Sequence, residues 1–157
     1  MTLTLTPLPR DALPRVAGFS LPEDQAGFAD LPTVTMATGA ARDGHMILFG
    51  QTPVGFFAID RDYAQTHEFA QEGSIGLRQF LIDHPHQGRG HAGSACLALS
   101  PYLRHHYPQA IDCYLTVNCR NPNARAAYLK GGFEDTGALY LDGGFGPQHI
   151  LQLDLIT

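Results

Sequence analysis

The stretch that decides the fold of this chain is Gln87-Gly88-Arg89-Gly90-His91-Ala92. The run Leu77–Ile82, which reads as a strand, precedes it, and an apolar pattern of helical period follows it. A strand, a glycine turn and a helix start together make a nest of backbone N–H groups that can hold a pyrophosphate. The two glycines let phosphate oxygens approach these amides and can adopt a positive φ at little steric cost. Arg89 and His91 add donors at the rim. The stretch therefore predicts a nucleotide-type cofactor.

The same glycines fit a second template. Gly88-x-Gly90-x-x-Gly93 matches the dinucleotide fingerprint, and Asp112 follows about 20 residues later. Against it, residues 83–86 separate the strand from the glycines, and only about 65 residues remain for further strands. A glycine turn that opens an ordinary helix is the third interpretation, and it is the simplest one for this hexapeptide alone.

A second pattern lies further along the chain. Asp112–Val117 is typical of a buried strand, with β-branched and aromatic residues. Asn121 is a suitable N-cap, Pro122 fits the first helical position, and Gly131 can end the helix in a left-handed conformation. The pattern predicts a helix of about nine residues with Ala124 and Tyr128 on one face.

Together these patterns resemble the GCN5-related N-acetyltransferases (GNAT). The shared order is strand, Gln-x-x-Gly-x-Ala, helix, strand, Asn-x-x-Ala-x-x-x-Tyr and Gly-Gly-Phe, with the motifs at residues 87–92, 121–128 and 131–133. The resemblance covers residues 44–157 well and the first 43 residues by position only. Within the superfamily, Leu77–Asp83 and Phe133–Gly137 more loosely resemble bacterial diamine and polyamine acetyltransferases.

The resemblance implies a single α/β (α+β) domain over residues 1–157. Its central sheet would be mixed and mostly antiparallel, with six or seven strands, splayed after the fourth strand and covered by helices on both faces. The residue pattern itself predicts a strand at residues 1–6, short helices around Arg10–Gly18 and Pro22–Ala29, and a hairpin of His45–Phe49 and Pro53–Ile59. A polar connection over Asp60–Gly73 follows the hairpin, and a helix from Ala92 is expected to kink or end early at Pro101. Closing strands are expected near Tyr140 and over Ile150–Leu155.

The activity implied is direct transfer of an acetyl group from acetyl-CoA to a primary amine. Coenzyme A leaves as a thiolate that needs a proton, and Tyr128 occupies the position where this family often carries that acid. A phenol with a pKa near 10 suits the role, and the alternative is a tyrosine packed on the sheet. The resemblance further implies that Gln87, Gly88, Arg89, Gly90, His91 and Ala92 hold the pyrophosphate, that Phe80, Leu81 and Ile82 offer backbone contacts to the thioester and pantetheine, and that Asn121 contacts the pantetheine arm.

The general base is not determined by the sequence. Candidates that flank the fourth and fifth strands are Asp60, Asp62, Glu68, Glu72, Asp112 and Asn118, each also explained as an ordinary polar side chain. The histidines His84, His86, His91, His105 and His106 lack metal-ligand spacing, so we expect cofactor-rim and surface residues and no metal. Nucleophilic catalysis is poorly supported, because Cys96 falls on the buried face of the expected helix and Ser94 has no recognisable triad partner.

The expected acceptor is a small polyamine, whose second cation Glu23, Asp24, Asp142, Glu68 or Glu72 would hold. The alternatives are a protein N-terminus or lysine, an aminoglycoside-like amine, or an acyl-CoA sensor without turnover. A net charge of −5 and a pI of about 5.8 speak against nucleic acid or an anionic membrane as partner and are compatible with a cationic acceptor.

Composition bounds the remaining expectations. With 157 residues, 44% of them hydrophobic, the chain can bury the core of one domain. The three cysteines are odd in number and suggest reduced thiols in a cytoplasm, and neither a signal peptide nor a membrane-spanning run is apparent. A homodimer is a compatible assembly.

Overall fold

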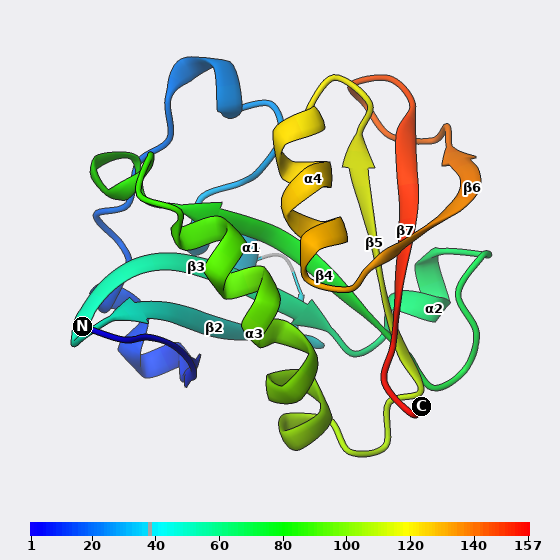
Figure 1. The fold of residues 1–157 in the computed structure, drawn as a ribbon, viewed down its shortest axis with the longest axis horizontal. Coiled ribbons are helices and arrows are strands. Elements are labelled where there is room, and N and C mark those ends of the chain that lie inside the picture. Colours follow the sequence, from blue (N-terminus) through cyan, green and yellow to red (C-terminus); the bar gives the residue numbers. More distant parts are fainter. Residues whose placement is uncertain (38) are drawn as a thin grey trace.

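The structure, a computed structural model, describes residues 1–37 and 39–157 and is built on one seven-stranded sheet (Figure 1). The strands are β1 Leu3–Leu8, β2 Arg42–Phe49, β3 Thr52–Asp60, β4 Ser74–Ile82, β5 Asp112–Asn118, β6 Glu134–Tyr140 and β7 Gln148–Asp154. They lie in the order β1-β2-β3-β4-β5-β7-β6, and every neighbouring pair is antiparallel except β4 and β5. The expected mixed, mostly antiparallel sheet is confirmed.

Helices cover both faces of this sheet, as the resemblance implied. They are the 3-10 turns η1 Arg10–Arg15, η2 Glu23–Gln25 and η3 His84–His86 and the α-helices α1 Pro32–Ala37, α2 Tyr63–Thr66, α3 His91–His106 and α4 Pro122–Lys130. Side chains of β3 alternate between the faces because successive residues of a strand point in opposite directions. Phe57 and Ile59 join the core under α3 and α4, whereas Phe56 and Ala58 pack with Met36 of α1. The ribbon shows α3 and α4 in front of the sheet and α1 behind it (Figure 1).

The short helices differ from those expected. Arg10–Gly18 and Pro22–Ala29 contain only the 3-10 turns η1 and η2, and the α-helix of this segment is α1, which the sequence pattern missed. The polar connection after β3 likewise contains α2. Helices this short are not stable by propensity, so burial of Met36 and Tyr63 accounts for α1 and α2.

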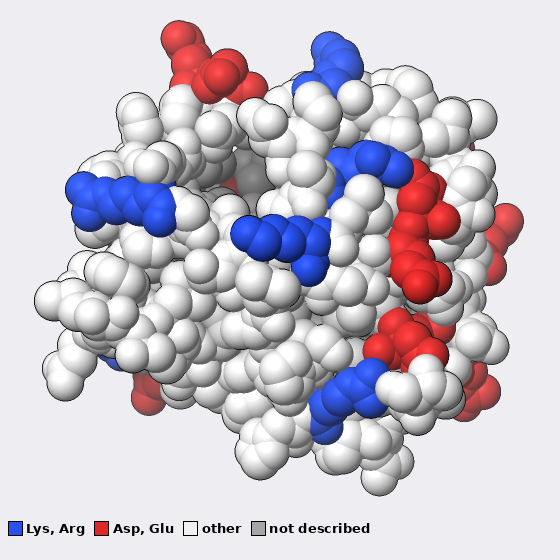
Figure 2. Space-filling model, viewed as in Figure 1, with Lys and Arg blue, Asp and Glu red and all other residues white. Residues whose placement is uncertain are grey.

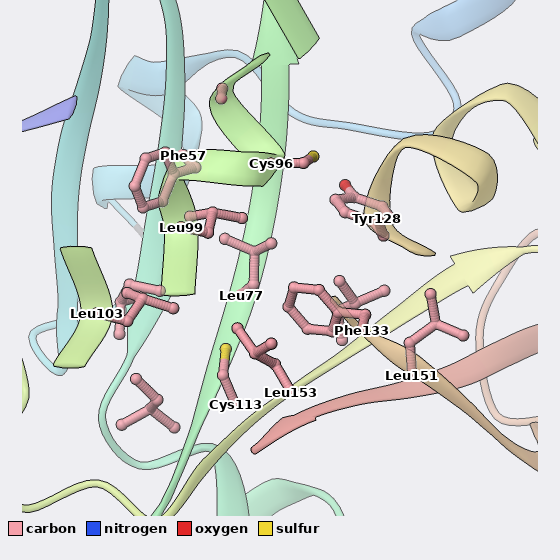
Figure 3. Packing of buried hydrophobic residues seen from close by; sticks show 14 of the residues in the cluster. Phe57, Leu77, Cys96, Leu99, Leu103, Cys113, Tyr128, Phe133, Leu151 and Leu153 are labelled. Atoms are coloured by element: carbon pink, nitrogen blue, oxygen red, sulfur yellow. The ribbon is translucent and has the colours of Figure 1, made fainter. Parts of the chain in front are cut away.

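Of the two outcomes expected at Pro101, a kink or an early end, the early end is wrong, because helix α3 continues to His106. Proline leaves the carbonyl of residue i−4 without its helical donor. Here that residue is Leu97, which is 53% exposed, so water can reach this side of the helix. On the opposite side Cys96, Leu99 and Leu103 are fully buried and hold the helix on the sheet (Figure 3).

The sheet opens between β4 and β5. The two parallel strands pair only at Ser74↔Asp112, Ile75↔Cys113 and Gly76↔Tyr114 and then diverge. Beyond this point β4 carries a bulge against β3, with Gln79 at a φ of +56°, and the Gln79 side chain accepts a hydrogen bond of 2.7 Å from the Asp30 amide. The splay after the fourth strand is therefore confirmed, and it creates a wedge-shaped opening.

The end of α4 packs directly on α3. Gly131 has an ordinary φ of −78°, and the left-handed residue is Gly132, with a φ of +105°, so the expected role of Gly131 as a left-handed cap is wrong. A Cβ on Gly131 would instead stand inside van der Waals contact of the Cys96 carbonyl in α3. Gly131 is thus required for the close approach of two helices.

We expect Gly131→Ala to lower the free energy of unfolding by about 1–3 kcal/mol, because the added methyl forces α3 and α4 apart. Urea denaturation followed by circular dichroism measures this change. Gly144→Ala is the matched control: a Cβ at Gly144 meets no atom within 4 Å, so its effect should stay within about 0.5 kcal/mol. Equal stability of the two variants would contradict the close-packing role.

Candidate active site

A cavity of about 680 Å³ lies in the wedge between β4 and β5. Its walls come from the strand segments that have diverged, from the turn between β4 and α3, from α4 and from the N-terminal segment that includes η2. Phe80 and Tyr128 contact one another on the side of α4, whereas Tyr63 belongs to a separate aromatic cluster with Tyr114 on the opposite face. The cavity therefore joins the two faces of the sheet. Figure 2 shows the surface hollowed between η2 and α3.

The glycine turn forms one end of the cavity, which we call the cofactor arm (lined by Gln87, Gly88, Gly90, His91, Ala92, Asn121, Ala124 and Tyr128). Gly88 and Gly90 have φ of +76° and +80°, values that favour glycine. Gly90 is the N-cap of the 16-residue helix α3, whose first amides have no acceptor within the helix. The turn thus offers backbone N–H groups and a helix dipole to an anion.

Gln87 serves the turn in a way that the sequence did not indicate. Its amide nitrogen donates to the Ile82 carbonyl at 2.9 Å and to Gln25 Oε1 at 3.0 Å, and Gln25 donates back to Gln87 at 3.2 Å. The side chain therefore fixes the turn to the end of β4 and to η2.

The two expected rim donors, Arg89 and His91, differ in their exposure to solvent. Arg89 is exposed and does not line the cavity. His91 lines it and is buried, with its ring 4.8 Å from that of Phe49, and its Nε2 has no hydrogen-bond partner among the described residues. Burial, followed by the charges of Arg89 and His86, lowers the pKa of His91, so this ring is neutral near pH 7.

Tyr128 and Asn121 both face the cofactor arm. The Tyr128 ring packs edge-on against Phe80 at 5.7 Å, and its hydroxyl points towards Cys96 (Figure 3). Burial, with smaller contributions from Cys96 and Cys113, raises the pKa of Tyr128 above its usual range, so the phenol keeps its proton. Burial also raises the pKa of Cys96 to about 12, which leaves it an unreactive thiol. Asn121 caps α4, because its Oδ1 accepts from the Ala124 amide at 3.4 Å.

The other end of the cavity, the acceptor arm, is mainly aromatic and polar (Phe28, Asp30, Tyr63, His67, Arg78, Gln79, Tyr140 and Phe145). The Tyr63 and His67 rings stack at 3.8 Å with an interplanar angle of 5°. The Arg78 guanidinium lies 5.2 Å from the centre of the Tyr63 ring and donates to Asp60 at 2.9 Å. Its charge is therefore largely balanced inside the protein.

The acidic residues expected to hold an acceptor lie elsewhere. Glu23, Asp24, Glu68, Glu72 and Asp142 are exposed and do not line the cavity. Of the expected bases, Asp60 is paired with Arg78, and Asp112 accepts from Ser74 and Gln152 at the closed end of the wedge. Among the described lining residues, Asp30 alone carries a carboxylate.

Comparison with known proteins identifies the class of enzyme. No protein-family model matches the chain. The uncharacterized N-acetyltransferase YbbJ of Bacillus subtilis (strain 168) is 30% identical over 143 residues, which cover 88% of this chain and 89% of YbbJ. The fold matches AAC(6′)-Ib in complex with paromomycin and acetyl-CoA (TM-score 0.76, 17% identity, 98% of this chain and 94% of that chain). It also matches the spermidine N-acetyltransferase from Vibrio cholerae in complex with CoA and spermine (TM-score 0.69, 19% identity, 98% and 95%).

The chain is thus an acyltransferase with an open-wedge α/β fold. More particularly, it belongs to the GCN5-related N-acetyltransferases. The family, fold and enzyme class implied by the sequence motifs are confirmed, whereas the roles of the individual site residues stay predictions.

Two further findings concern the described residues. No helix in this part of the chain is long and apolar enough to cross a membrane. Nor do three or more of its histidine, cysteine, aspartate or glutamate side chains come together in a group that could hold a metal ion.

His67 is the feature of the site that the sequence pattern missed, since Asp60–Gly73 reads as a polar connection. One signal was present: Tyr63 and His67 are four residues apart, the spacing of ring pairs on one helical face. Of the rings that bury the pair, Phe69 lies in the same connection, two residues after His67. Tyr140 of β6 and Tyr114 of β5, which packs on Phe69, come from other segments and could not be predicted from that spacing.

Proposed function

We propose that residues 1–157 form one N-acetyltransferase domain that transfers the acetyl group of acetyl-CoA directly to a primary amine. The observation that carries this proposal is the cavity through the wedge, which joins the anion-binding turn on one face to the aromatic arm on the other. Two substrates that enter from opposite faces can meet there, between Phe80 and the diverged end of β5.

The cofactor arm suits coenzyme A. Its pyrophosphate would lie on the amides of residues 87–92, with Arg89 at the solvent rim and His91 as a neutral wall. The pantetheine would follow Phe80 and Leu81 of β4, where divergence leaves backbone groups without a partner on β5, and reach Asn121 on α4. At Ile82 the carbonyl already accepts from Gln87. Basic side chains lie over α3 and α4 in Figure 2, whereas acidic ones gather along β6 and at the tip of the η2 segment. The basic side chains over α3 and α4 favour a phosphate-bearing ligand on that part of the surface.

Tyr128 would protonate the leaving thiolate. The amine nitrogen bonds to the thioester carbon, the C–S bond breaks, and the sulfur takes the proton of the Tyr128 hydroxyl. Burial raises the pKa of Tyr128, and it would also raise the pKa of the coenzyme A thiol in the same arm. Because both pKa values rise, proton transfer from the Tyr128 hydroxyl to the sulfur stays feasible.

A small polyamine is the first acceptor to test. The net charge of −5 and the likeness to a spermidine acetyltransferase support it, and Asp30, which lines the cavity, would hold its second cation. An aminoglycoside is the second, supported by the likeness to AAC(6′)-Ib.

We expect CoA release with spermidine or putrescine, a product heavier by one acetyl group, and a KM for spermidine that rises with salt. The salt effect follows because a Debye length of about 8–10 Å screens the attraction of Asp30. The assay compares spermidine, putrescine, an aminoglycoside and a peptide with a free N-terminus at fixed salt. If only another amine is acetylated, the polyamine is not the acceptor. Binding of acetyl-CoA without release of CoA with any of these amines would indicate an acyl-CoA sensor.

The cellular setting and assembly complete the proposal. All three cysteines lie within the described residues and are unpaired, which supports a reducing, cytoplasmic compartment. Leu139 and Leu141, at and just beyond the edge strand β6, are 50% and 71% exposed, which supports a homodimer that sedimentation would detect.

A further inference from the structure

We propose that His67 is the general base that takes the proton from the acceptor ammonium. This inference rests on the proposed function, because it assigns a step of that reaction to a residue of the acceptor arm. Three properties of the His67 ring support it: its tautomer, its fixed position and its charge state.

The tautomer is set by the end of α2. The Thr66 hydroxyl donates to the Tyr63 carbonyl at 3.3 Å, so its oxygen is left to accept from His67 Nδ1 at 2.9 Å. The same carbonyl lies 3.2 Å from Nδ1, and a carbonyl can only accept. Nδ1 therefore carries the hydrogen, and in the neutral ring Nε2 keeps its lone pair.

The position of the ring is fixed at the vertex of the wedge. His67 is 7% exposed, stacks on Tyr63 and lies 5.4 Å from the rings of both Phe69 and Tyr140. Tyr63 in turn packs against Gly76, the last residue of β4 that pairs with β5. The ring therefore lines the cavity just where the two strands part, on the acceptor face, and cannot swing away without disrupting this stack.

The surroundings keep the ring neutral. The groups that face it are Tyr63 of α2, Arg78 of β4, Asp60 of β3 and Tyr140 of β6. Burial and then the Arg78 charge lower the pKa of His67, outweighing the Tyr63 carbonyl and Asp60, which raise it. A neutral imidazole at pH 7 is ready to accept a proton, whereas Asp60 is held by Arg78.

Each proton of the proposed reaction has a donor and an acceptor. The bound ammonium gives one proton to Nε2, the neutral amine attacks the thioester carbon, and the C–S bond breaks as the sulfur takes the Tyr128 proton. The second proton leaves the new amide nitrogen and restores the Tyr128 hydroxyl through water. His67 releases its proton to solvent, so ammonium and acetyl-CoA give amide, CoA thiol and one proton.

The test is His67→Asn, whose amide can still donate to the Tyr63 carbonyl but has no group at the position of Nε2. With the best amine of the panel, we expect kcat to fall about 10- to 100-fold at pH 7 while KM for acetyl-CoA stays unchanged. The deficit should shrink steadily towards pH 10, because the variant must draw its free amine from solution. His105→Asn, at the exposed end of α3, is the matched control and should behave as wild type throughout.

The remaining outcomes are distinguishable. A His67→Asn enzyme with wild-type kcat from pH 6 to 10, or with a loss that does not change with pH, would overturn the base assignment and leave the acetyltransferase intact. A wild-type protein that acetylates no amine would overturn the proposed function and this inference with it. If His67→Asn fails to fold, His67→Gln replaces it: its amide reaches the position of Nε2 but is not basic, so the same pH-dependent loss is expected and the same outcomes decide.

Discussion

Tyr128→Phe is expected to lower kcat by about 100- to 1000-fold and to leave acetyl-CoA binding within about twofold of wild type. The substitution keeps the ring and its contacts with Phe80 and Phe133, and it removes only the hydroxyl that points towards Cys96. Without a donor, the leaving group must depart as a thiolate into a buried arm, which is unfavourable.

Single-turnover measurements should be used, so that product release does not hide the chemical step. Tyr102→Phe is the matched control, because it removes a partly buried hydroxyl, bonded to His45 at 2.6 Å, outside the cavity. This control should lower the free energy of unfolding by about 1 kcal/mol and leave the rate of turnover unchanged. An unchanged single-turnover rate in Tyr128→Phe would mean that water protonates the thiolate and that Tyr128 is a packing residue.

Gly90→Asp should weaken acetyl-CoA binding about 100- to 1000-fold, or about 3–4 kcal/mol. Nothing lies within 4 Å of a Cβ at this position, and aspartate tolerates a positive φ better than most residues, so the protein should still fold. The new carboxylate would occupy the N-cap of α3, accept from the free amides and repel the pyrophosphate, an interaction of about 4 kcal/mol at 4 Å and an effective dielectric of 20.

Calorimetry of acetyl-CoA binding measures this effect. Gly90→Asn has the same shape without the charge, so it should bind distinctly better than Gly90→Asp and separate repulsion from blockage. If a folded Gly90→Asp protein binds acetyl-CoA with wild-type affinity, the pyrophosphate does not bind at this turn.

Local sequence chemistry predicted much of the cofactor side of the molecule. The positive φ values of Gly88 and Gly90 and the Asn121 cap depend on residues adjacent in the chain, so the motifs contain the information. The limits of α1 and α2 and the continuation of α3 through Pro101 depend on which faces are buried, and the pattern could not supply that.

The acceptor side was less predictable for the same reason. Charge and the resemblance suggested five carboxylates, which are exposed, and none of them lines the cavity. Asp30 and His67 line it because Gln79 of the β4 bulge bonds one segment and the aromatic stack beside Gly76 holds the other. Both arrangements join residues that are distant in the sequence.

The reciprocal pair of hydrogen bonds between Gln25 and Gln87 has a thermodynamic consequence. Gln87 belongs to the turn that would receive the cofactor, and Gln25 begins the segment that continues to Phe28 and Asp30 in the acceptor arm. A shift of the turn on cofactor binding would act, through these two hydrogen bonds, on the segment that lines the acceptor arm. Because linkage is reciprocal, the factor by which the cofactor changes the affinity for the amine equals the factor by which the amine changes the affinity for the cofactor, whichever binds first.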